Sequence, residues 1–177
     1  METRKPNRLT EYDYSTNGAY FVTICTKGRM PLLCDIVGDD AHIVPSDYGQ
    51  VVDKYIRRID GIDKYVIMPN HIHMIIRIEN GPMWASAPTQ SLPTRIRSFK
   101  VLVSKELGAS IFQRSYYDHV IRGQQDYQEI WQYIDTNPLR WQLDEHYCER
   151  NNSDFQKGDN NDENQGIFRP KRGQTLG

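Results

Sequence analysis

A chain of 177 residues is long enough for one domain with a full hydrophobic core. Its net charge of −1 excludes the uniformly basic surface of a general nucleic-acid binder, so any positive surface for DNA must be local. No run approaches the roughly 18 apolar residues of a membrane span, and no apolar segment follows the polar first residues as in a secretory signal. The lack of a membrane-length run predicts no membrane partner. Three widely spaced cysteines form no disulfide or metal-finger pattern, which predicts a reducing, cytoplasmic location.

Strand and helix signals alternate along the chain. β-branched and aromatic runs between turn residues predict strands, and apolar residues at helical spacing after capping residues predict helices. The expected elements are strands at 19–26 and 32–37, a helix from Ser46 or Asp47 to Gly61, a strand ending near 79, a helix at 93–107, a strand at 115–121, a helix at 126–136 and a last helix at 139–146.

This order, β, β, α, β, α, β, α, predicts an α+β fold in which helices pack on an antiparallel sheet. The expected domain spans residues 19–148. Residues 1–18 form a polar arm before it. Residues 149–177 are rich in Asn, Asp and Gln and contain too few apolar residues to order themselves, so we predict a disordered tail.

Residues 65–78 contain two apolar runs around Pro69-Asn70, and the second run carries two histidines. Strand side chains alternate between faces, so Ile72, Met74, Ile76 and Ile78 share one apolar face that must meet the core. His71 and His73 then lie side by side on the other face, roughly 6–7 Å apart along the strand. Two neutral imidazoles on one rigid strand can bind one divalent cation.

Spacing alone leaves other interpretations of this pair open. The two histidines could be half-exposed strand residues without chemistry, and His-x-His also occurs in cupins. A histidine-triad hydrolase needs a third alternating histidine, where this chain has Ile75. A cupin needs further ligands on later strands, which the predicted helices contradict.

Two further groups of residues are candidates for function. Tyr133 and Asn137 are four residues apart and share one face of the third helix, although spacing alone favours a structural role, with Tyr133 in core packing and Asn137 as the cap of the helix that begins at Pro138. The second helix carries a basic face without acidic residues before Glu106, which makes it a candidate phosphate-contact surface. The predicted DNA contacts are Arg95, Arg97, Lys100 and Arg122.

Four separated motifs resemble one known family, in the same order. They are GAYFVTICT at 18–26, MPNHIH at 68–73, YYDHVIR at 116–122 and YIDTNPLRW at 133–141. Together they resemble the single-tyrosine transposases of the HUH superfamily, and most closely the REP-associated tyrosine transposases. The resemblance covers about residues 19–141 and implies a ferredoxin- or RRM-like antiparallel sheet layered with helices.

The resemblance also implies a chemistry. Tyr133 falls on the family's nucleophile, and His71, His73 and Asn137 fall on its ligands for a divalent metal, Mg²⁺ or Mn²⁺. Such enzymes cut and rejoin single-stranded DNA near hairpins through a 5′-phosphotyrosine. Relatives occur as monomers and as homodimers that exchange the tyrosine helix. The alternative is a module that binds hairpins and has lost the chemistry.

Overall fold

The structure, a computed structural model, describes residues 12–79 and 90–143. The elements in these ranges are β1 (Gly18–Cys25), the 3-10 turn η1 (Lys27–Arg29), β2 (Cys34–Val37), β3 (His42–Pro45), α1 (Asp47–Ile56), β4 (Ile62–Ile67), β5 (His71–Ile78), α2 (Leu92–Leu107), β6 (Tyr117–Ile121), α3 (Gln124–Thr136) and the 3-10 helix η2 (Pro138–Leu143). The tail predicted at 149–177 and most of the arm at 1–18 lie outside the described residues. Within the described ranges, no helix has the length and apolar character that crossing a membrane requires.

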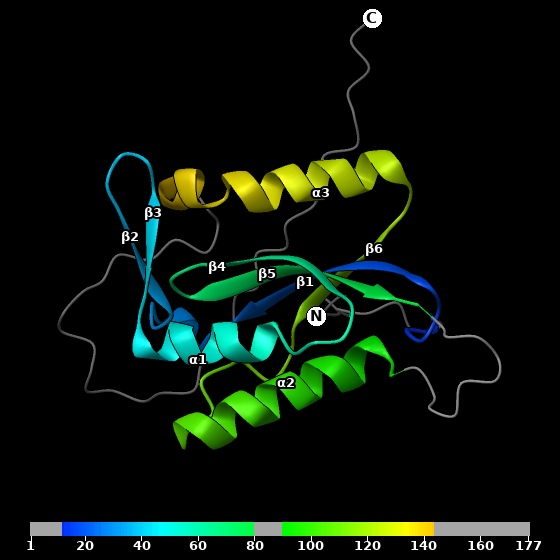
Figure 1. The fold of residues 1–177 in the computed structure, drawn as a ribbon, viewed down its shortest axis with the longest axis horizontal. Coiled ribbons are helices and arrows are strands. Elements are labelled where there is room, and N and C mark those ends of the chain that lie inside the picture. Colours follow the sequence, from blue (N-terminus) through cyan, green and yellow to red (C-terminus); the bar gives the residue numbers. More distant parts are fainter. Residues whose placement is uncertain (1–11, 80–89, 144–177) are drawn as a thin grey trace, which may run out of the picture.

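Four strands form one antiparallel sheet in the order β4-β5-β1-β6. Helix α3 lies over one face of this sheet, and α1 and α2 lie over the other (Figure 1). The hairpin β2–β3 forms a second, smaller sheet beside η2 (Figure 1). The predicted α+β class, an antiparallel sheet with helices packed on it, is confirmed.

The side chains of β5 alternate between the two layers as predicted. Ile72, Met74, Ile76 and Ile78 are buried in the larger apolar cluster, which α1 and α2 complete. Ile75 belongs instead to a smaller cluster with Ile130 and Ile134 of α3. His71 and His73 point to the same side as Ile75, so the two histidines lie between the sheet and α3.

The helix boundaries follow from local chemistry. Ser46 is the N-cap of α1, as predicted, and its hydroxyl accepts a hydrogen bond from the Gly49 amide at 3.1 Å. Helix α3 ends at Thr136 with Asn137 as its C-cap, but Asn137 keeps helical angles (φ −57°, ψ −44°) although Pro138 follows it. The chain therefore passes directly from α3 into the 3-10 helix η2. The last predicted helix is a 3-10 helix through Leu143, and residues 144–146 lie outside the description.

Two strands were absent from the predicted order. Strand β3 is mostly exposed, so its residues show no apolar alternation that could reveal it. The apolar stretch at 62–78 is two paired strands, β4 and β5, because the chain turns sharply at 68–70 and the Met68 amide donates to the His71 carbonyl at 2.9 Å. This turn places His71 at the first position of β5.

Gly61, before β4, provides a test of this packing. It has a φ of +74°, and a Cβ there would overlap the Arg77 carbonyl oxygen. Gly108 has a similar φ of +68°, but nothing lies near its added Cβ. We expect Gly108→Ala to cost about 1–2 kcal/mol from backbone conformation alone. Gly61→Ala should cost at least about 3 kcal/mol, because the clash adds to it. Urea unfolding of both variants measures the difference, and equal costs would contradict the packing at Gly61.

Candidate active site

The two histidines of β5 converge on one point beneath α3. Both residues are completely buried, and their Nε2 atoms lie 3.0 Å apart. The ring centroids are 4.5 Å apart, less than the roughly 6–7 Å expected along the strand, because the rings lean toward each other. The alternative of half-exposed histidines on an open strand face is therefore wrong.

Each imidazole has a hydrogen-bond partner at its other nitrogen. His71 Nδ1 lies 2.8 Å from Oδ1 of Asn70, and His73 Nδ1 lies 2.9 Å from Oγ1 of Thr23. Thr23 is the direct partner of His73 across the β1–β5 pair, so regular strand pairing places its hydroxyl. These contacts hold both rings with their Nε2 atoms directed to the shared point.

Tyr133 of α3 completes the convergence. Its hydroxyl lies 3.2 Å from His73 Nε2, and its ring meets the His73 ring at a centroid distance of 5.1 Å. Phe21 of β1 stacks on His73 at 5.3 Å and meets the Tyr133 ring edge-on. Trp141 of η2 lies 6.0 Å from the His71 ring. Since the imidazoles have no exposed surface, an external ligand can reach them only after a covering side chain moves.

Asn137 follows Tyr133 by one helical turn and is 2% exposed. Asn137 and Tyr133 share one face of α3, so the helix face that meets the imidazoles offers a phenol oxygen and a buried amide. Nitrogen ligands bind divalent metals at about 2.1 Å, so a nitrogen separation of 3.0 Å allows both to bind one ion. The described residues contain no group of three or more His, Cys, Asp or Glu side chains arranged for a metal. Among the described residues, a third ligand for a metal here would therefore have to be an amide or a hydroxyl rather than a further His, Cys, Asp or Glu.

Tyr133 differs in its position from Tyr116 and Tyr127, two other tyrosines whose hydroxyls could act as nucleophiles. Tyr116 is buried in the cluster on the far side of the sheet. The Tyr127 hydroxyl donates to Asp63 at 2.7 Å. His119 does not join the site either, because its Nε2 bonds Asp126 in the first turn of α3.

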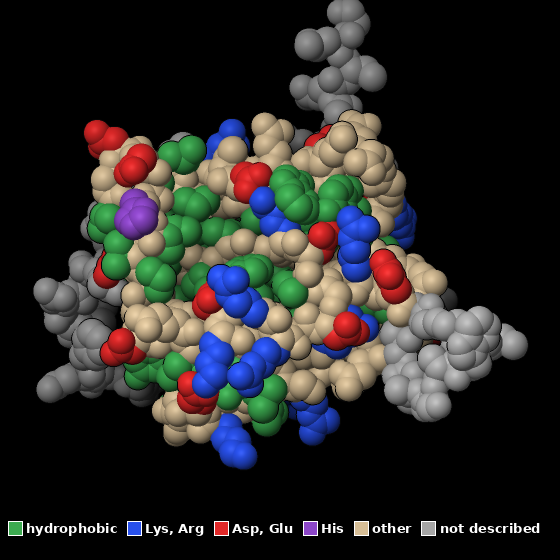
Figure 2. Space-filling view, viewed as in Figure 1, with side chains coloured by type: hydrophobic (Ala, Val, Ile, Leu, Met, Phe, Trp, Pro, Cys, Tyr) green, Lys and Arg blue, Asp and Glu red, His purple; other side chains and the backbone are tan. Residues whose placement is uncertain are grey.

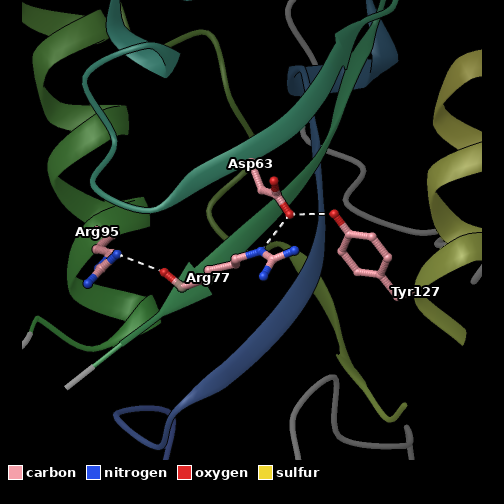
Figure 3. Close-up of polar contacts among 4 residues, drawn as sticks. All are labelled: Asp63, Arg77, Arg95 and Tyr127. Carbon is pink, nitrogen blue, oxygen red and sulfur yellow. Dashed lines mark hydrogen bonds and ion pairs between the residues drawn. The ribbon is translucent and has the colours of Figure 1, made fainter. Parts of the chain in front are cut away.

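Polar contacts hold α3 against the edge of the sheet. The Asp63 carboxylate of β4 accepts hydrogen bonds from Tyr127 of α3 and from Arg77 of β5 at 2.8 Å (Figure 3). Lys64 pairs with Asp135 near the other end of the helix. Burial of Asp63 opposes its ionisation, but the hydrogen bonds from Tyr127 and Arg77 and the charge of Arg77 outweigh burial and lower its pKa.

We expect Tyr127→Phe to lower the free energy of unfolding by about 1–2 kcal/mol at pH 7, because a hydrogen bond to a charged group is lost. A carboxyl with a depressed folded pKa stabilises the fold above its unfolded pKa and loses that effect as pH falls through the folded value. The difference between variant and wild type should therefore shrink below about pH 4. Urea unfolding at pH 7, 5 and 3 measures it, with Tyr48→Phe on α1 as the exposed control. A difference independent of pH would contradict this account.

The predicted DNA contacts are not brought together with the histidines. Arg95, Arg97 and Lys100 belong to α2, on the opposite side of the sheet from α3 (Figure 1). Arg122 lies exposed between β6 and the start of α3. The Lys and Arg side chains over α1 and α2 have Asp and Glu side chains among them, so this side of the molecule is not a basic patch of one sign (Figure 2).

Arg95 corrects the prediction of an exposed basic face. Its side chain is 3% exposed and pairs with Asp60 at 2.8 Å. Its guanidinium also donates to the carbonyls of Asp60, Gln90 and Arg77, the last at 3.1 Å (Figure 3). Lys100 similarly donates to the carbonyls of Gln113 and Ser115. Helical spacing predicts that Arg95 and Lys100 are near solvent, but both side chains bind backbone carbonyls within the protein. Of the three predicted contacts on α2, only Arg97 is exposed.

Comparisons with known proteins agree with this architecture. No family model matches the chain. An uncharacterized protein of Haemophilus influenzae is 33% identical over 171 residues, which cover 82% of this chain and 94% of that protein. A protein of the same organism that is assigned as a REP-associated tyrosine transposase is 28% identical over 137 residues, covering 72% and 74%. A solved REP-associated tyrosine transposase bound to a REP hairpin has a TM-score of 0.55 and 23% identity, covers 75% of this chain and 74% of its own, and shows the same fold.

Proposed function

We propose that this chain, which belongs to the family of REP-associated tyrosine transposases, cuts and rejoins single-stranded DNA with Tyr133 as its nucleophile. One observation carries the proposal: the Tyr133 hydroxyl lies 3.2 Å from a pair of imidazoles whose Nε2 atoms are 3.0 Å apart. A phenol beside two potential metal ligands is the arrangement that covalent attack on a phosphodiester requires. Tyr133 is also half-buried rather than fully enclosed, so its oxygen can meet a substrate once the site opens.

The proposed substrate is DNA with a hairpin beside the cleavage site. The solved family member that shares this fold is bound to a REP hairpin. Arg97 and Arg122 are the exposed residues among the four predicted contacts and remain proposed contacts with DNA phosphates. Arg97 lies on α2, across the sheet from the histidines, and Arg122 lies between β6 and α3. We therefore propose that these two residues contact the duplex of the hairpin rather than the phosphate that reacts.

The proposed reaction follows from the residues around Tyr133. Its oxygen attacks the phosphorus, the new Tyr133–phosphorus bond replaces the bond to the 3′ oxygen, and that oxygen leaves as a 3′-hydroxyl after taking a proton. The product is a 5′-phosphotyrosine, which a second 3′-hydroxyl can attack to reverse the step and join new ends. Phe21 and the His73 ring hold the Tyr133 ring, which limits the directions its oxygen can take.

We propose that His71, His73 and Asn137 hold a divalent cation, Mg²⁺ or Mn²⁺. The 3.0 Å separation of the two Nε2 atoms supports the histidine pair as ligands, and the position of Asn137 one turn after Tyr133 supports the amide. When bound, the ion would neutralise a non-bridging phosphate oxygen and assist ionisation of the Tyr133 hydroxyl, whose ordinary pKa of about 10 makes it a weak nucleophile. His71 and His73 contribute by keeping their Nε2 atoms together, and Asn137 by placing an uncharged oxygen one turn after the nucleophile.

The test is a cleavage assay with end-labelled single-stranded DNA that contains the hairpins flanking the gene. Protein and DNA are combined with Mg²⁺, with Mn²⁺ or with EDTA, and the products are run on a denaturing protein gel. The proposal expects a labelled protein–DNA adduct that depends on the metal and is absent with EDTA.

The second candidate function is hairpin binding without catalysis. One observation favours it: His71 and His73 are fully buried and hydrogen-bonded, as structural histidines are. The chain would then bind hairpins without cutting them. Tight hairpin binding without any adduct, in either metal, would support this alternative and exclude the transposase reaction.

A further inference from the structure

We infer that Asn70 is a positioning residue that holds His71 in a single tautomer, with the proton on Nδ1 and the lone pair on Nε2. The inference concerns the protein alone, and its relevance to metal binding rests on the proposed function. It makes Asn70, whose side chain is completely buried, part of the site in addition to the two histidines and Tyr133.

The orientation of the Asn70 amide carries the first step. Its Nδ2 donates to the carbonyl oxygen of Arg29 at 3.1 Å, and its Oδ1 faces His71 Nδ1 at 2.8 Å. If the amide were flipped, its oxygen would face the Arg29 carbonyl, and two acceptors would lie in contact. The Arg29 carbonyl therefore decides which amide atom His71 meets.

The second step follows from the chemistry of an amide oxygen. It can only accept a hydrogen bond, so His71 Nδ1 must carry the hydrogen. In a neutral imidazole the other nitrogen, Nε2, then has the lone pair, which is the form that binds a metal. In the metal-free protein His73 Nε2, 3.0 Å away, must then carry a hydrogen and donate it to His71 Nε2, because two lone pairs would repel at that distance.

The backbone of Asn70 is fixed as firmly as its side chain. The Thr26 amide donates to the Asn70 carbonyl at 2.9 Å. The single hydrogen of the Thr26 hydroxyl lies between two carbonyl oxygens, that of Asn70 at 3.0 Å and that of Met30 at 2.8 Å. Thr26 begins the η1 turn, where Arg29 takes a positive φ of +53°. The turn after β1 thus contacts Asn70 twice: Thr26 binds its backbone carbonyl, and the Arg29 carbonyl orients its side-chain amide.

His73 differs because its partner is a hydroxyl. Thr23 Oγ1 can donate to Nδ1 or accept from it, so this contact permits either tautomer of His73. The two rings therefore have different constraints: Asn70 fixes one, and Thr23 adapts to the other. This contrast supplies a matched control.

The experiment is a long-range ¹H–¹⁵N correlation spectrum of the metal-free full chain at neutral pH, without DNA, with His71 assigned from a His71→Gln variant. We expect His71 Nε2 to be the nitrogen without hydrogen in wild type and in Asn70→Asp. This variant keeps the acceptor at His71 Nδ1 but replaces the donor to the Arg29 carbonyl with a second acceptor, so it should be less stable than wild type. Asn70→Leu should give a mixture of tautomers, while Thr23→Val should leave the His71 signals unchanged. In parallel, Mn²⁺ titration should show affinity reduced about 10–100-fold in Asn70→Leu and largely kept in Asn70→Asp.

A hydrogen on His71 Nε2 in wild type would overturn the inference, as would an unchanged His71 tautomer in a folded Asn70→Leu. If Asn70→Leu does not fold, the wild-type and Asn70→Asp spectra still decide the tautomer. Failure of the proposed function gives a different result: the predicted tautomer would be present, but wild type would not bind Mn²⁺ or form an adduct.

Discussion

Tyr133→Phe is expected to abolish the covalent protein–DNA adduct, a loss of at least about 10³-fold in the cleavage assay, because the nucleophilic oxygen is removed. The substitution deletes one oxygen and keeps the ring. The contacts of that ring with Phe21 and His73 should therefore remain, and the fold should keep nearly all of its stability.

A measurement of hairpin binding distinguishes the loss of adduct formation from unfolding of the variant. Tyr133→Phe should bind labelled hairpin DNA as wild type does, since its hydroxyl is needed for the reaction only. Tyr48→Phe is the control, because Tyr48 is exposed on α1, across the sheet from the site, and its adduct yield should not change. A Tyr133→Phe protein that still forms an adduct would assign the nucleophile to another residue.

The second large effect is expected at the histidine pair. We expect His71→Ala and His73→Ala each to lower Mn²⁺ affinity at least about 100-fold, because loss of a direct ligand should exceed the 10–100-fold cost typical of its outer hydrogen-bond partners. Adduct formation should be lost in both variants. Mn²⁺ titration of the free protein measures the first effect without depending on DNA.

His42→Ala provides the matched control for this pair. His42 is exposed on β3, so its removal should leave Mn²⁺ binding and adduct yield unchanged. Circular dichroism of all three variants would verify that the sheet remains folded. Wild-type Mn²⁺ affinity in either His71→Ala or His73→Ala would show that the ion, if it binds, is held elsewhere.

Strand alternation was the most reliable guide from sequence to structure. It placed Ile72 and Met74 in one layer and both histidines in the other, because the period of two holds wherever a strand is paired on both sides. The approach of Tyr133 to His73 depends on how α3 crosses the sheet, 60 residues later in the chain. Residue spacing carries no information on such a crossing, and only the resemblance to a family suggested it.

Arg95 shows why charge alone is a poor guide to exposure. A helical wheel treats arginine as exposed, but the Asp60 carbonyl in the turn before β4 and the Arg77 carbonyl of β5 need a buried donor. Asn70 was missed for a related reason. Next to Pro69 it indicates a turn, and its contact with His71 becomes visible only when the Arg29 carbonyl is in place.

Tyr133 is the residue that we propose forms the covalent bond to DNA. The most direct measurement is mass spectrometry of the protease-digested adduct, formed by wild-type protein with Mn²⁺ and hairpin DNA. The account predicts a nucleotide linked to the peptide that contains Tyr133, with fragmentation placing the phosphate on that side chain. A phosphate on any other residue, or no linked peptide despite cleaved DNA, would contradict it.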